Sequence, residues 1–311
     1  DGGAYGSYGV ASTFYTGALQ TVTYPIANYK FEAMRVFTNK APCGPKRGHG
    51  TPQPRFALEV LLDKFAEDLG LDPSELRLRH LMPDNSLSVN HLTVTTNGLG
   101  ECLRKVTAAS GFQQRRIESS PGKGFGLGCG SYLSGAGLPI YWNKMPHSGV
   151  QIKIDGSTDI GQGSNSVLAG IVAEELGIHL QHVIVVTADT DLTPVDLGSY
   201  SSRVTLMTGN AAIAAARPLR EKILSAAAEV MKIPATELTI RKGKVAKLNG
   251  SGESVSFLDA IQWAEAKFGT LGSVGSYTPP RRGGKFKGAG VGPSPNYSYS
   301  ACVAEVTCDP E

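Results

Sequence analysis

The sequence predicts an α+β fold, because segments with helical periodicity and segments with strand-like patterning follow one another without strict strand–helix–strand alternation. Apolar residues recur every three or four positions in the helical segments, and β-branched or alternating apolar residues mark the strand-like ones. The helical patterns cover 52–69, 99–108, 165–176 and 207–230, and the strand-like patterns cover 29–38, 150–154, 182–187 and 297–307.

Local signals place the ends of several elements. Thr51-Pro52 is typical of an N-cap followed by proline at the first helical position, and Gly70 is expected to end that helix. Asp72-Pro73-Ser74-Glu75 predicts the start of a further helix by a capping-box-like pattern. Ser256 and Asp259 predict another capped start, and Lys242-Gly243 predicts the turn of a hairpin over 238–248.

Pro218 interrupts the long helical pattern of 207–230, so a kink or a split is expected there. Residues 83–97 are polar and predict a loop, and the short helix that follows is expected to lead into a second domain. The predicted domain boundaries are therefore 1–97 for a first domain, 98–121 for a connecting segment and 122–311 for a second domain.

Composition excludes several classes of protein. A net charge of +3 on 311 residues gives no electrostatic case for binding nucleic acid or a membrane surface. No run approaches the roughly 20 apolar residues of a membrane span. The five cysteines form no Cys-x-x-Cys pair, which argues against an iron–sulfur or zinc site built by this chain. A reducing, cytoplasmic location is expected.

Three glycine- or hydroxyl-rich loops precede predicted helices and could bind an anion, because backbone N–H groups and the helix dipole favour negative charge there. The first spans 43–53 and carries Arg47, a fork-shaped donor for oxygen ligands. The second contains Gly161-Gln162-Gly163, which lacks the glycine spacing of a dinucleotide-binding loop. The third spans 189–210 and is rich in serine, threonine and aspartate.

Each loop also has a plain structural interpretation, as a solvent-exposed turn or as ordinary helix capping. The aspartates of the third loop (Asp189, Asp191 and Asp196) do not have the spacing of a calcium-binding loop, so we expect no metal ion there.

The three loops, in this order, resemble those of the xanthine-oxidase-type molybdenum hydroxylases. In that family an Arg-Gly-x-Gly-x-Pro-Gln loop approaches the metal, a Gly-Gln-Gly turn holds the pterin or its nucleotide, and a Ser/Thr-rich loop before a helix adds contacts. Asp1-Gly2-Gly3-Ala4-Tyr5 is similar to a strand of the family's first cofactor domain. The resemblance implies these cofactor-binding residues: Arg47, Gly48, Gly161, Gln162, Gly163, Ser201, Ser202, Arg203 and Thr205.

Within the family, three stretches are most similar to the α subunits of 4-hydroxybenzoyl-CoA reductases: 43–53, Tyr-Leu-Ser-Gly-Ala at 132–136, and 198–205. Oxidases of the family carry aromatic residues where this chain has Lys46 and His49. The resemblance implies reductive removal of a phenolic hydroxyl from an aromatic acyl-CoA, with His49 and Tyr200 at the substrate.

By the same resemblance, the cofactor is molybdopterin cytosine dinucleotide, with molybdenum held through the pterin and not by protein side chains. FAD and iron–sulfur clusters lie on two partner subunits, and the assembly is a dimer of heterotrimers. Two alternatives remain open, an oxidative hydroxylase of an aromatic heterocycle or aldehyde, and an inactive structural fragment.

Two departures from the family pattern concern the cofactor site. The family has an additional strand before the Gly-Gln-Gly turn, whereas Asp155-Gly156-Ser157 joins the predicted strand almost directly to it. The family's catalytic glutamate is expected beyond residue 311, so no catalytic residue is assigned here. We therefore expect a fragment spanning parts of two cofactor-binding domains, inactive by itself.

Overall fold

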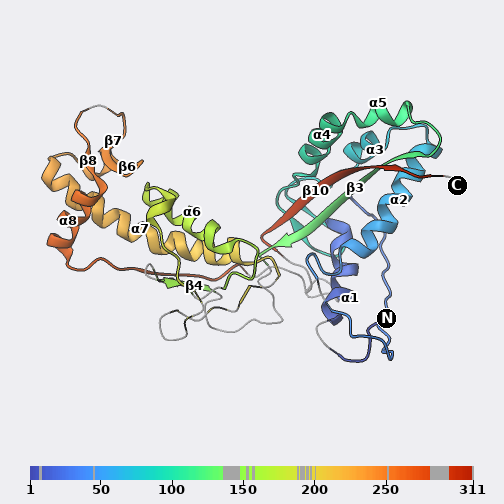
Figure 1. Cartoon of the computed structure of the whole chain (residues 1–311), viewed down its shortest axis with the longest axis horizontal. Helices are drawn as coiled ribbons and strands as arrows, with labels where there is room; N and C mark the ends of the chain where they lie inside the picture. Colours follow the sequence, from blue (N-terminus) through green and yellow to red (C-terminus); the bar gives the residue numbers. More distant parts are fainter. Residues whose placement is uncertain are drawn as a thin grey trace. The chain divides into compact units, whose positions relative to one another are not determined.

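The computed structural model (Figure 1) divides the chain into two compact units, and each is described by itself. The first unit comprises Asp1–Tyr141 and Arg281–Glu311, and the second comprises Trp142–Pro280. The structure describes residues 1–6, 9–44, 46–135, 148–151, 154–155, 158–187, 189, 193, 196, 198–199, 201–250, 252–280 and 294–309. Helices and strands are mixed without βαβ order, so the predicted α+β class is confirmed.

The first unit is built around a long two-stranded ribbon. Strands β3 (Lys123–Ser134) and β10 (Asn296–Thr307) pair antiparallel along their whole length, although some 160 residues separate them in the sequence. Alternate residues of β3, such as Leu127 and Leu133, point into the core because side chains alternate between the two faces of a strand. The opposite face carries glycine at alternate positions from Gly124 to Gly130.

Helices cover one face of this ribbon (Figure 1). The remaining elements of the first unit are α1 (Gly9–Ala18), η1 (Leu19–Val22), α2 (Pro52–Asp68), α3 (Pro73–Arg79), β1 (Ser86–Leu87), β2 (Thr93–Val94), α4 (Leu99–Ser110) and α5 (Phe112–Ile117). Leucines and aromatic residues of α1, α4 and α5 fill the space beneath the ribbon, among them Tyr15, Leu103 and Phe112. Burial of these side chains is the main driving force for this packing.

The helix boundaries of the first unit follow the expected local signals. Pro52 is the first residue of α2, and the Asp72 carboxylate caps α3 by accepting hydrogen bonds from the Ser74 and Glu75 amides. Thr51 does not cap α2 with its side chain, because its hydroxyl donates instead to the Gly48 carbonyl at 2.7 Å. That bond closes the turn that precedes the helix.

The second unit is organised around one long helix, α7 (Val204–Met231). Pro218 lies inside α7, which continues through it as a single helix, so the expected split does not occur. The other elements are β4 (Ser148–Gln151), β5 (Ile154–Asp155), α6 (Ser164–Leu176), η3 (Leu180–His182), η4 (Ala235–Glu237), β6 (Leu238–Arg241), β7 (Lys244–Lys247), β8 (Val255–Ser256), α8 (Phe257–Phe268) and β9 (Val274–Tyr277).

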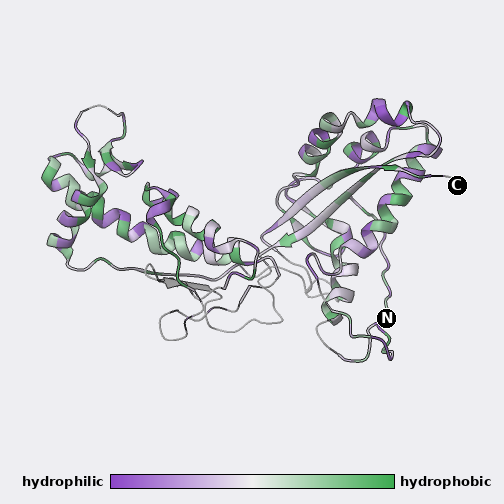
Figure 2. Cartoon of the chain, in the orientation of Figure 1, coloured by the Kyte–Doolittle hydropathy of each residue, from purple (hydrophilic) through white to green (hydrophobic). Residues whose placement is uncertain are grey.

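Small residues let the neighbours of α7 approach closely. Its buried face carries alanine at Ala211, Ala212, Ala215 and Ala216, against α6 and β9. A Cβ atom added at Gly275 of β9 would lie 2.2 Å from the Ala211 carbonyl oxygen, so strand and helix are in backbone contact there. Figure 2 shows apolar residues on α6 and α7 where the two helices lie side by side.

The hairpin and the capped helix of the second unit confirm the sequence prediction. Lys242 and Gly243 have φ of 51° and 70°, the left-handed pair that a two-residue hairpin turn requires. The Ser256 hydroxyl caps α8 by accepting a hydrogen bond from the Asp259 amide.

Two predicted strands are wrong. Residues 29–38 form an extended segment held by isolated backbone hydrogen bonds, such as Gly2 N–H to the Val36 carbonyl at 2.7 Å. In the second segment, His182 ends η3 and residues 183–187 form no regular structure, with Ile184 84% exposed. β-Branched and aromatic residues favour a strand only if a neighbouring strand can pair with it, and among the described residues neither segment has one.

Candidate functional site

The loop before α2 presents His49 between two glycines with left-handed backbone conformation. Gly48 has φ of 72° and Gly50 has φ of 87°. A Cβ atom at Gly50 would lie 2.3 Å from the Ser12 carbonyl oxygen, so only glycine lets the loop lie this close to α1. The Thr16 hydroxyl of α1 also donates to the Gly50 carbonyl at 2.8 Å. The loop is therefore fixed to α1 on one side.

Two tyrosines surround the His49 ring. The Tyr132 hydroxyl of β3 lies 3.0 Å from Nδ1 and 3.2 Å from Nε2 of His49. The Tyr15 ring of α1 packs edge-on against His49, with 5.0 Å between ring centroids and 72° between planes. Partial burial lowers the pKa of His49 below its ordinary value, because burial disfavours the charged imidazolium. Burial therefore favours the neutral form of the ring.

Arg47 lies two residues before His49 and is exposed. It has no hydrogen bond or ion pair within the part of the chain that the structure describes. Its five N–H donors are thus available to an oxygen-rich ligand.

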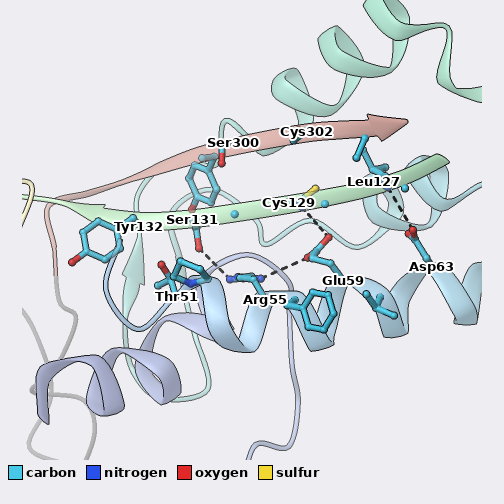
Figure 3. A pocket seen from close by; sticks show the side chains of 18 of the residues that line it. Thr51, Arg55, Glu59, Asp63, Leu127, Cys129, Ser131, Tyr132, Ser300 and Cys302 are labelled. Carbon is cyan, nitrogen blue, oxygen red and sulfur yellow. Dashed lines mark hydrogen bonds and ion pairs between the residues drawn. The ribbon is translucent and has the colours of Figure 1, made fainter. Parts of the chain in front are cut away.

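Helix α2 runs along the outer edge of β3 and satisfies that edge with its side chains (Figure 3). The Glu59 carboxylate accepts a hydrogen bond from the Cys129 amide at 3.0 Å, and the Asp63 carboxylate accepts one from the Leu127 amide at 3.5 Å. Four helical residues rise about 6 Å and two strand residues rise about 6.6 Å. Carboxylates four positions apart on α2 therefore match alternate amides of β3.

Buried arginines neutralise these carboxylates. Arg77 of α3 is fully buried and pairs with Glu59 at 2.8 Å and with Asp63 at 2.7 Å. Its Nη2 atom also donates to the Leu127 carbonyl at 3.1 Å. Arg55, one turn before Glu59, donates to the Ser131 hydroxyl at 3.1 Å and lies 4.0 Å from Glu59. This arrangement is a structural ion network, since each member is tied to backbone or to an opposite charge.

A groove of about 620 Å³ lies between α2 and the glycine face of the ribbon. Its polar lining comes from Arg55, Glu59 and Asp63 on α2 and from Tyr132 and Ser300 on the ribbon (Figure 3). None of the predicted cofactor residues lines this groove.

The Gly-Gln-Gly turn lies at the start of α6, as expected, but its backbone donors already have an acceptor. The Asp159 carboxylate accepts hydrogen bonds from the amides of Gly161 at 2.8 Å, Gly163 at 3.2 Å and Asn165 at 3.2 Å. These bonds hold the pKa of Asp159 below its ordinary value. An aspartate thus occupies the position that the anion-binding hypothesis gave to a phosphate.

Gln162 is exposed, and both ends of its amide are engaged within the turn. Its oxygen accepts from the Ile160 amide at 2.7 Å, and its nitrogen donates to the Ser164 hydroxyl at 3.0 Å. A Cβ atom at Gly161 or Gly163 would meet nothing within 4 Å, so the space in front of the turn is open.

The serine-rich loop before α7 contains two strained residues. Ser201 and Ser202 have φ of 50° and 51°, a conformation that non-glycine residues rarely adopt and that clusters at functional sites. Ser202 and Thr205 are exposed, whereas Ser201 is buried. Tyr200, predicted at the substrate, lies outside the described residues.

Arg203 is buried and forms an ion pair with Asp196 at 2.9 Å and a hydrogen bond to the Gly198 carbonyl at 2.8 Å. Its charge is therefore used to hold this loop together. A hydrogen bond from the Ser199 hydroxyl to the Thr158 carbonyl joins the serine-rich loop to the Gly-Gln-Gly loop. The second unit thus brings two of the predicted loops together, and the first unit holds the Arg47–His49 loop.

Comparison with protein families shows the family of the chain. The sequence model of the molybdopterin cofactor-binding domain matches residues 104–311, and a second model of the same description matches residues 1–81. The chain belongs to this family. It corresponds to part of the molybdopterin-binding large subunit of the xanthine oxidase family.

Known relatives agree with this assignment. The chain is 32% identical over 300 residues to a putative xanthine dehydrogenase molybdenum-binding subunit of Escherichia coli (strain K12), covering 91% of this chain and 38% of that protein. It is 30% identical over 252 residues to the gamma subunit of the 6-hydroxypseudooxynicotine dehydrogenase complex of Paenarthrobacter nicotinovorans, covering 76% of this chain and 32% of the relative. The chain thus spans less than two fifths of these relatives' length.

The fold is similar to that of solved structures. Quinoline 2-oxidoreductase from Pseudomonas putida 86 matches with a TM-score of 0.73 and 23% identity, over 99% of this chain and 42% of that chain. In the described part of the chain, no helix is long and apolar enough to span a membrane. No cluster of three metal-ligating side chains is found among the same residues.

The residues present fit a pterin-nucleotide cofactor in part. Arg47, Ser202 and Thr205 are exposed donors, and the space before Gly161 and Gly163 is open. The backbone amides of Gly161 and Gly163 and the guanidinium of Arg203 are engaged within the protein. Sequence reasoning assigned no role to Tyr15, Tyr132 or Asp159. Tyr132 opens the stretch 132–136 that was noted for its resemblance, and Asp159 is an acidic residue just before the glycines.

Proposed function

We propose that this chain is the molybdenum-cofactor-binding part of an oxidoreductase that acts on an aromatic substrate. The observation that carries the proposal is the Arg47–Gly50 loop, which presents an exposed arginine beside a partly buried histidine ring in a chain of this family. The relatives that the chain matches include xanthine and 6-hydroxypseudooxynicotine dehydrogenase subunits, whose names specify ring substrates.

The bound molybdenum cofactor would supply the two-electron redox chemistry. In this proposal Arg47 donates charge-assisted hydrogen bonds to cofactor oxygens, while the Gly48 backbone lets the loop come close to them. The exposed Ser202 and Thr205 hydroxyls and the Gln162 amide add neutral contacts, and Ser201 shapes the turn. Arg203 acts through Asp196 by keeping the serine-rich loop in place.

The Gly161 and Gly163 amides hold Asp159 in this proposal, so the carboxylate keeps the turn in shape. A phosphate placed on the same amides would meet the negative charge of Asp159. We therefore assign Gly161 and Gly163 to close approach of the backbone. We assign the direct contact to the second N–H of the Gln162 side chain, because its bond to Ser164 uses only one of the two.

For the substrate we propose 4-hydroxybenzoyl-CoA, with His49 and Tyr200 at its ring. The observation behind it is that a histidine stands where the family's oxidases carry an aromatic clamp residue. The reaction consumes two electrons and two protons, breaks the phenolic C–O bond and releases benzoyl-CoA and water. The cofactor is molybdopterin cytosine dinucleotide, and partner subunits with FAD and iron–sulfur clusters deliver the electrons in a cytoplasmic dimer of heterotrimers.

A second candidate is oxidative hydroxylation of an aromatic heterocycle. It is favoured by the relatives themselves, which include a nicotine 6-hydroxylase large subunit of Paenarthrobacter nicotinovorans, 24% identical over 267 residues. Both candidates use the same loops and differ in the direction of electron flow.

The test uses the complete parent enzyme, purified with its partner subunits and assayed for molybdenum. Reduced viologen should be oxidised when 4-hydroxybenzoyl-CoA is added, with benzoyl-CoA as product. If xanthine or nicotine instead reduces an oxidised dye, the oxidative candidate replaces the reductive one. A fully loaded enzyme that turns over none of these substrates would refute the proposal of an aromatic substrate.

The role of Arg47 has its own test. Replacing Arg47 by Ala should lower molybdenum occupancy or turnover by about 10-fold or more, because charge-assisted hydrogen bonds to the cofactor are lost. Arg104→Ala is the matched control, since it removes an exposed arginine of α4 far along the chain from the loop. Equal molybdenum occupancy and turnover in the two variants would show that Arg47 does not bind the cofactor.

A further inference from the structure

The backbone of the His49 loop does not by itself fix the orientation of the imidazole ring. Gly48 and Gly50 determine where the loop passes and where the His49 side chain begins. The torsion that rotates a histidine ring is broad and roughly two-fold. A ring that must present one face to a ligand therefore needs a second contact to hold it.

The structure supplies that contact from β3. The rings of Tyr15, His49 and Tyr132 form a triangle with centroid distances of 5.0, 5.6 and 6.2 Å, and each pair is packed edge to face. Such packing restrains the ring planes but leaves the imidazole free to exchange its nitrogen and carbon edges. The hydroxyl of Tyr132 removes this freedom because it lies within 3.2 Å of both imidazole nitrogens.

We propose that Tyr132 is a positioning residue that holds His49 as an oriented ring, so that His49 meets the substrate with its face. This inference rests on the proposed function for the role of His49, but the Tyr132–His49 link stands on geometry alone. The two imidazole nitrogens point in different directions within the ring plane, so the Tyr132 hydroxyl forms a hydrogen bond with one nitrogen at a time.

The position of Tyr132 supports this role. It lies on β3, whose neighbouring edge is held in place by the carboxylates of α2, so the hydroxyl is attached to a rigid element. Tyr132 also lines the end of the groove nearest Thr51, which follows the His49 loop. The loop is thereby held between α1 on one side and β3 on the other.

A double-mutant cycle in the complete, molybdenum-loaded enzyme tests the proposal, with 4-hydroxybenzoyl-CoA and xanthine as probes. Tyr132→Phe keeps the ring and removes the hydroxyl, and His49→Phe keeps a flat ring that has no nitrogen to hold. We expect Tyr132→Phe to raise KM by about 10-fold with a smaller change in kcat, and to have no further effect in the His49→Phe background. His49→Phe should itself raise KM, because His49 lies at the substrate ring in the proposed function.

Tyr299→Phe is the control, because that hydroxyl donates to the Val22 carbonyl at 3.2 Å and not to His49. It should leave KM unchanged. Equal effects of Tyr132→Phe with and without His49, or loss of turnover specific to His49→Phe in correctly folded enzyme, would overturn the proposal. The second result would make His49 an acid–base group.

Nuclear magnetic resonance of the 311-residue chain separates this inference from the proposed function. The ring ¹⁵N resonances of His49 should shift in Tyr132→Phe and remain unchanged in Tyr299→Phe. If no probe is turned over but the resonances shift, the link stands and the proposed function fails. If the resonances are the same in wild type and Tyr132→Phe, the link itself is wrong.

Discussion

Helix α2 of the first unit and helix α7 of the second unit each pack against a strand of their own unit, yet they do so by different means. Helix α2 reaches β3 through long charged side chains, which bury Arg55, Glu59 and the facing Arg77. Helix α7 reaches β9 with almost no side chain, through Ala211 and Gly275.

The difference determines what each region tolerates. In the first unit, removal of one partner leaves an uncompensated buried charge, and the cost is electrostatic. In the second unit, addition of a single methyl group produces overlap with backbone, and the cost is steric. The comparison therefore predicts opposite sensitivities, to deletion of side chains around α2 and to enlargement of side chains around α7.

The largest expected effect is at Glu59. Replacing Glu59 by Ala should destabilise the first unit by about 3–5 kcal/mol, because it removes one of the two carboxylates that neutralise the buried Arg77 and leaves the Cys129 amide without its acceptor. Chemical denaturation would measure the change. Glu67→Ala, about two turns further along α2, is the control. The Glu67 side chain is 65% exposed and pairs with Arg116 on the surface, so this variant should cost at most about 1 kcal/mol. Equal unfolding midpoints for the two variants would contradict the prediction.

A substitution at Gly275 tests the steric packing of β9 against α7. Gly275→Ala should destabilise the second unit by about 1–3 kcal/mol, since the new methyl group would overlap Ala211 and Ala215 backbone atoms. Thermal unfolding would show the loss. At Gly272 a Cβ atom would meet nothing within 4 Å, so Gly272→Ala should stay within about 0.5 kcal/mol of wild type. A tolerated Gly275→Ala would show that β9 and α7 can separate without loss.

A smaller effect is expected from acid at the Gly-Gln-Gly turn. The pKa of Asp159 is depressed, so its contribution is complete above the ordinary value of 3.8 and is lost as pH falls through the lower, folded value. The amide resonances of Gly161 and Gly163 should therefore shift below about pH 4, while Gly243 in the hairpin serves as reference. In Asp159→Asn the two resonances should be independent of pH. If the two resonances titrated in Asp159→Asn as they do in wild type, the group that binds the proton would not be Asp159.

The last prediction is that the Cys129 thiol does not react with an alkylating reagent. Burial raises the pKa of its thiol to about 12, so almost no thiolate forms at pH 8. Iodoacetamide at pH 8 should label the exposed Cys43, Cys302 and Cys308 and spare Cys129, as mass spectrometry of peptides would show. Labelling of Cys129 at the rate of Cys302 would mean that β3 separates readily from α2.

Most of the helices could be predicted from the sequence because their signals are local. Pro52, the Asp72 cap, the Ser256 cap and the Lys242-Gly243 turn act within a few residues, and each element appears where it was expected. The strand over 297–307 was also predicted, but its pairing with β3 was not, because a register between segments so distant in sequence has no local signal. The strands predicted at 29–38 and 182–187 did not form, because among the described residues neither segment has a neighbouring strand to pair with. The local sequence does not show whether such a partner exists.

The sequence predicted the loops that carry the candidate residues, but it did not predict the contacts that these residues form. The positions of Arg47, Gln162 and Ser202 follow from family motifs, and they remain proposals. The Gly161 amide donates to Asp159, and Arg203 pairs with Asp196. Both contacts depend on the path of a loop, which the spacing of residues in the sequence does not specify. The link between His49 and Tyr132 joins residues 83 apart and requires the fold.

The match between α2 and β3 also sets where this region can change length. Residues four apart on the helix face residues two apart on the strand, through Glu59 with Cys129 and Asp63 with Leu127. One residue inserted within α2 would turn the following carboxylate about 100° away from the strand, and one inserted within β3 would transfer its core residues to the glycine face. Insertions and deletions should therefore be restricted to the segments outside these two elements, such as the turn at Gly70.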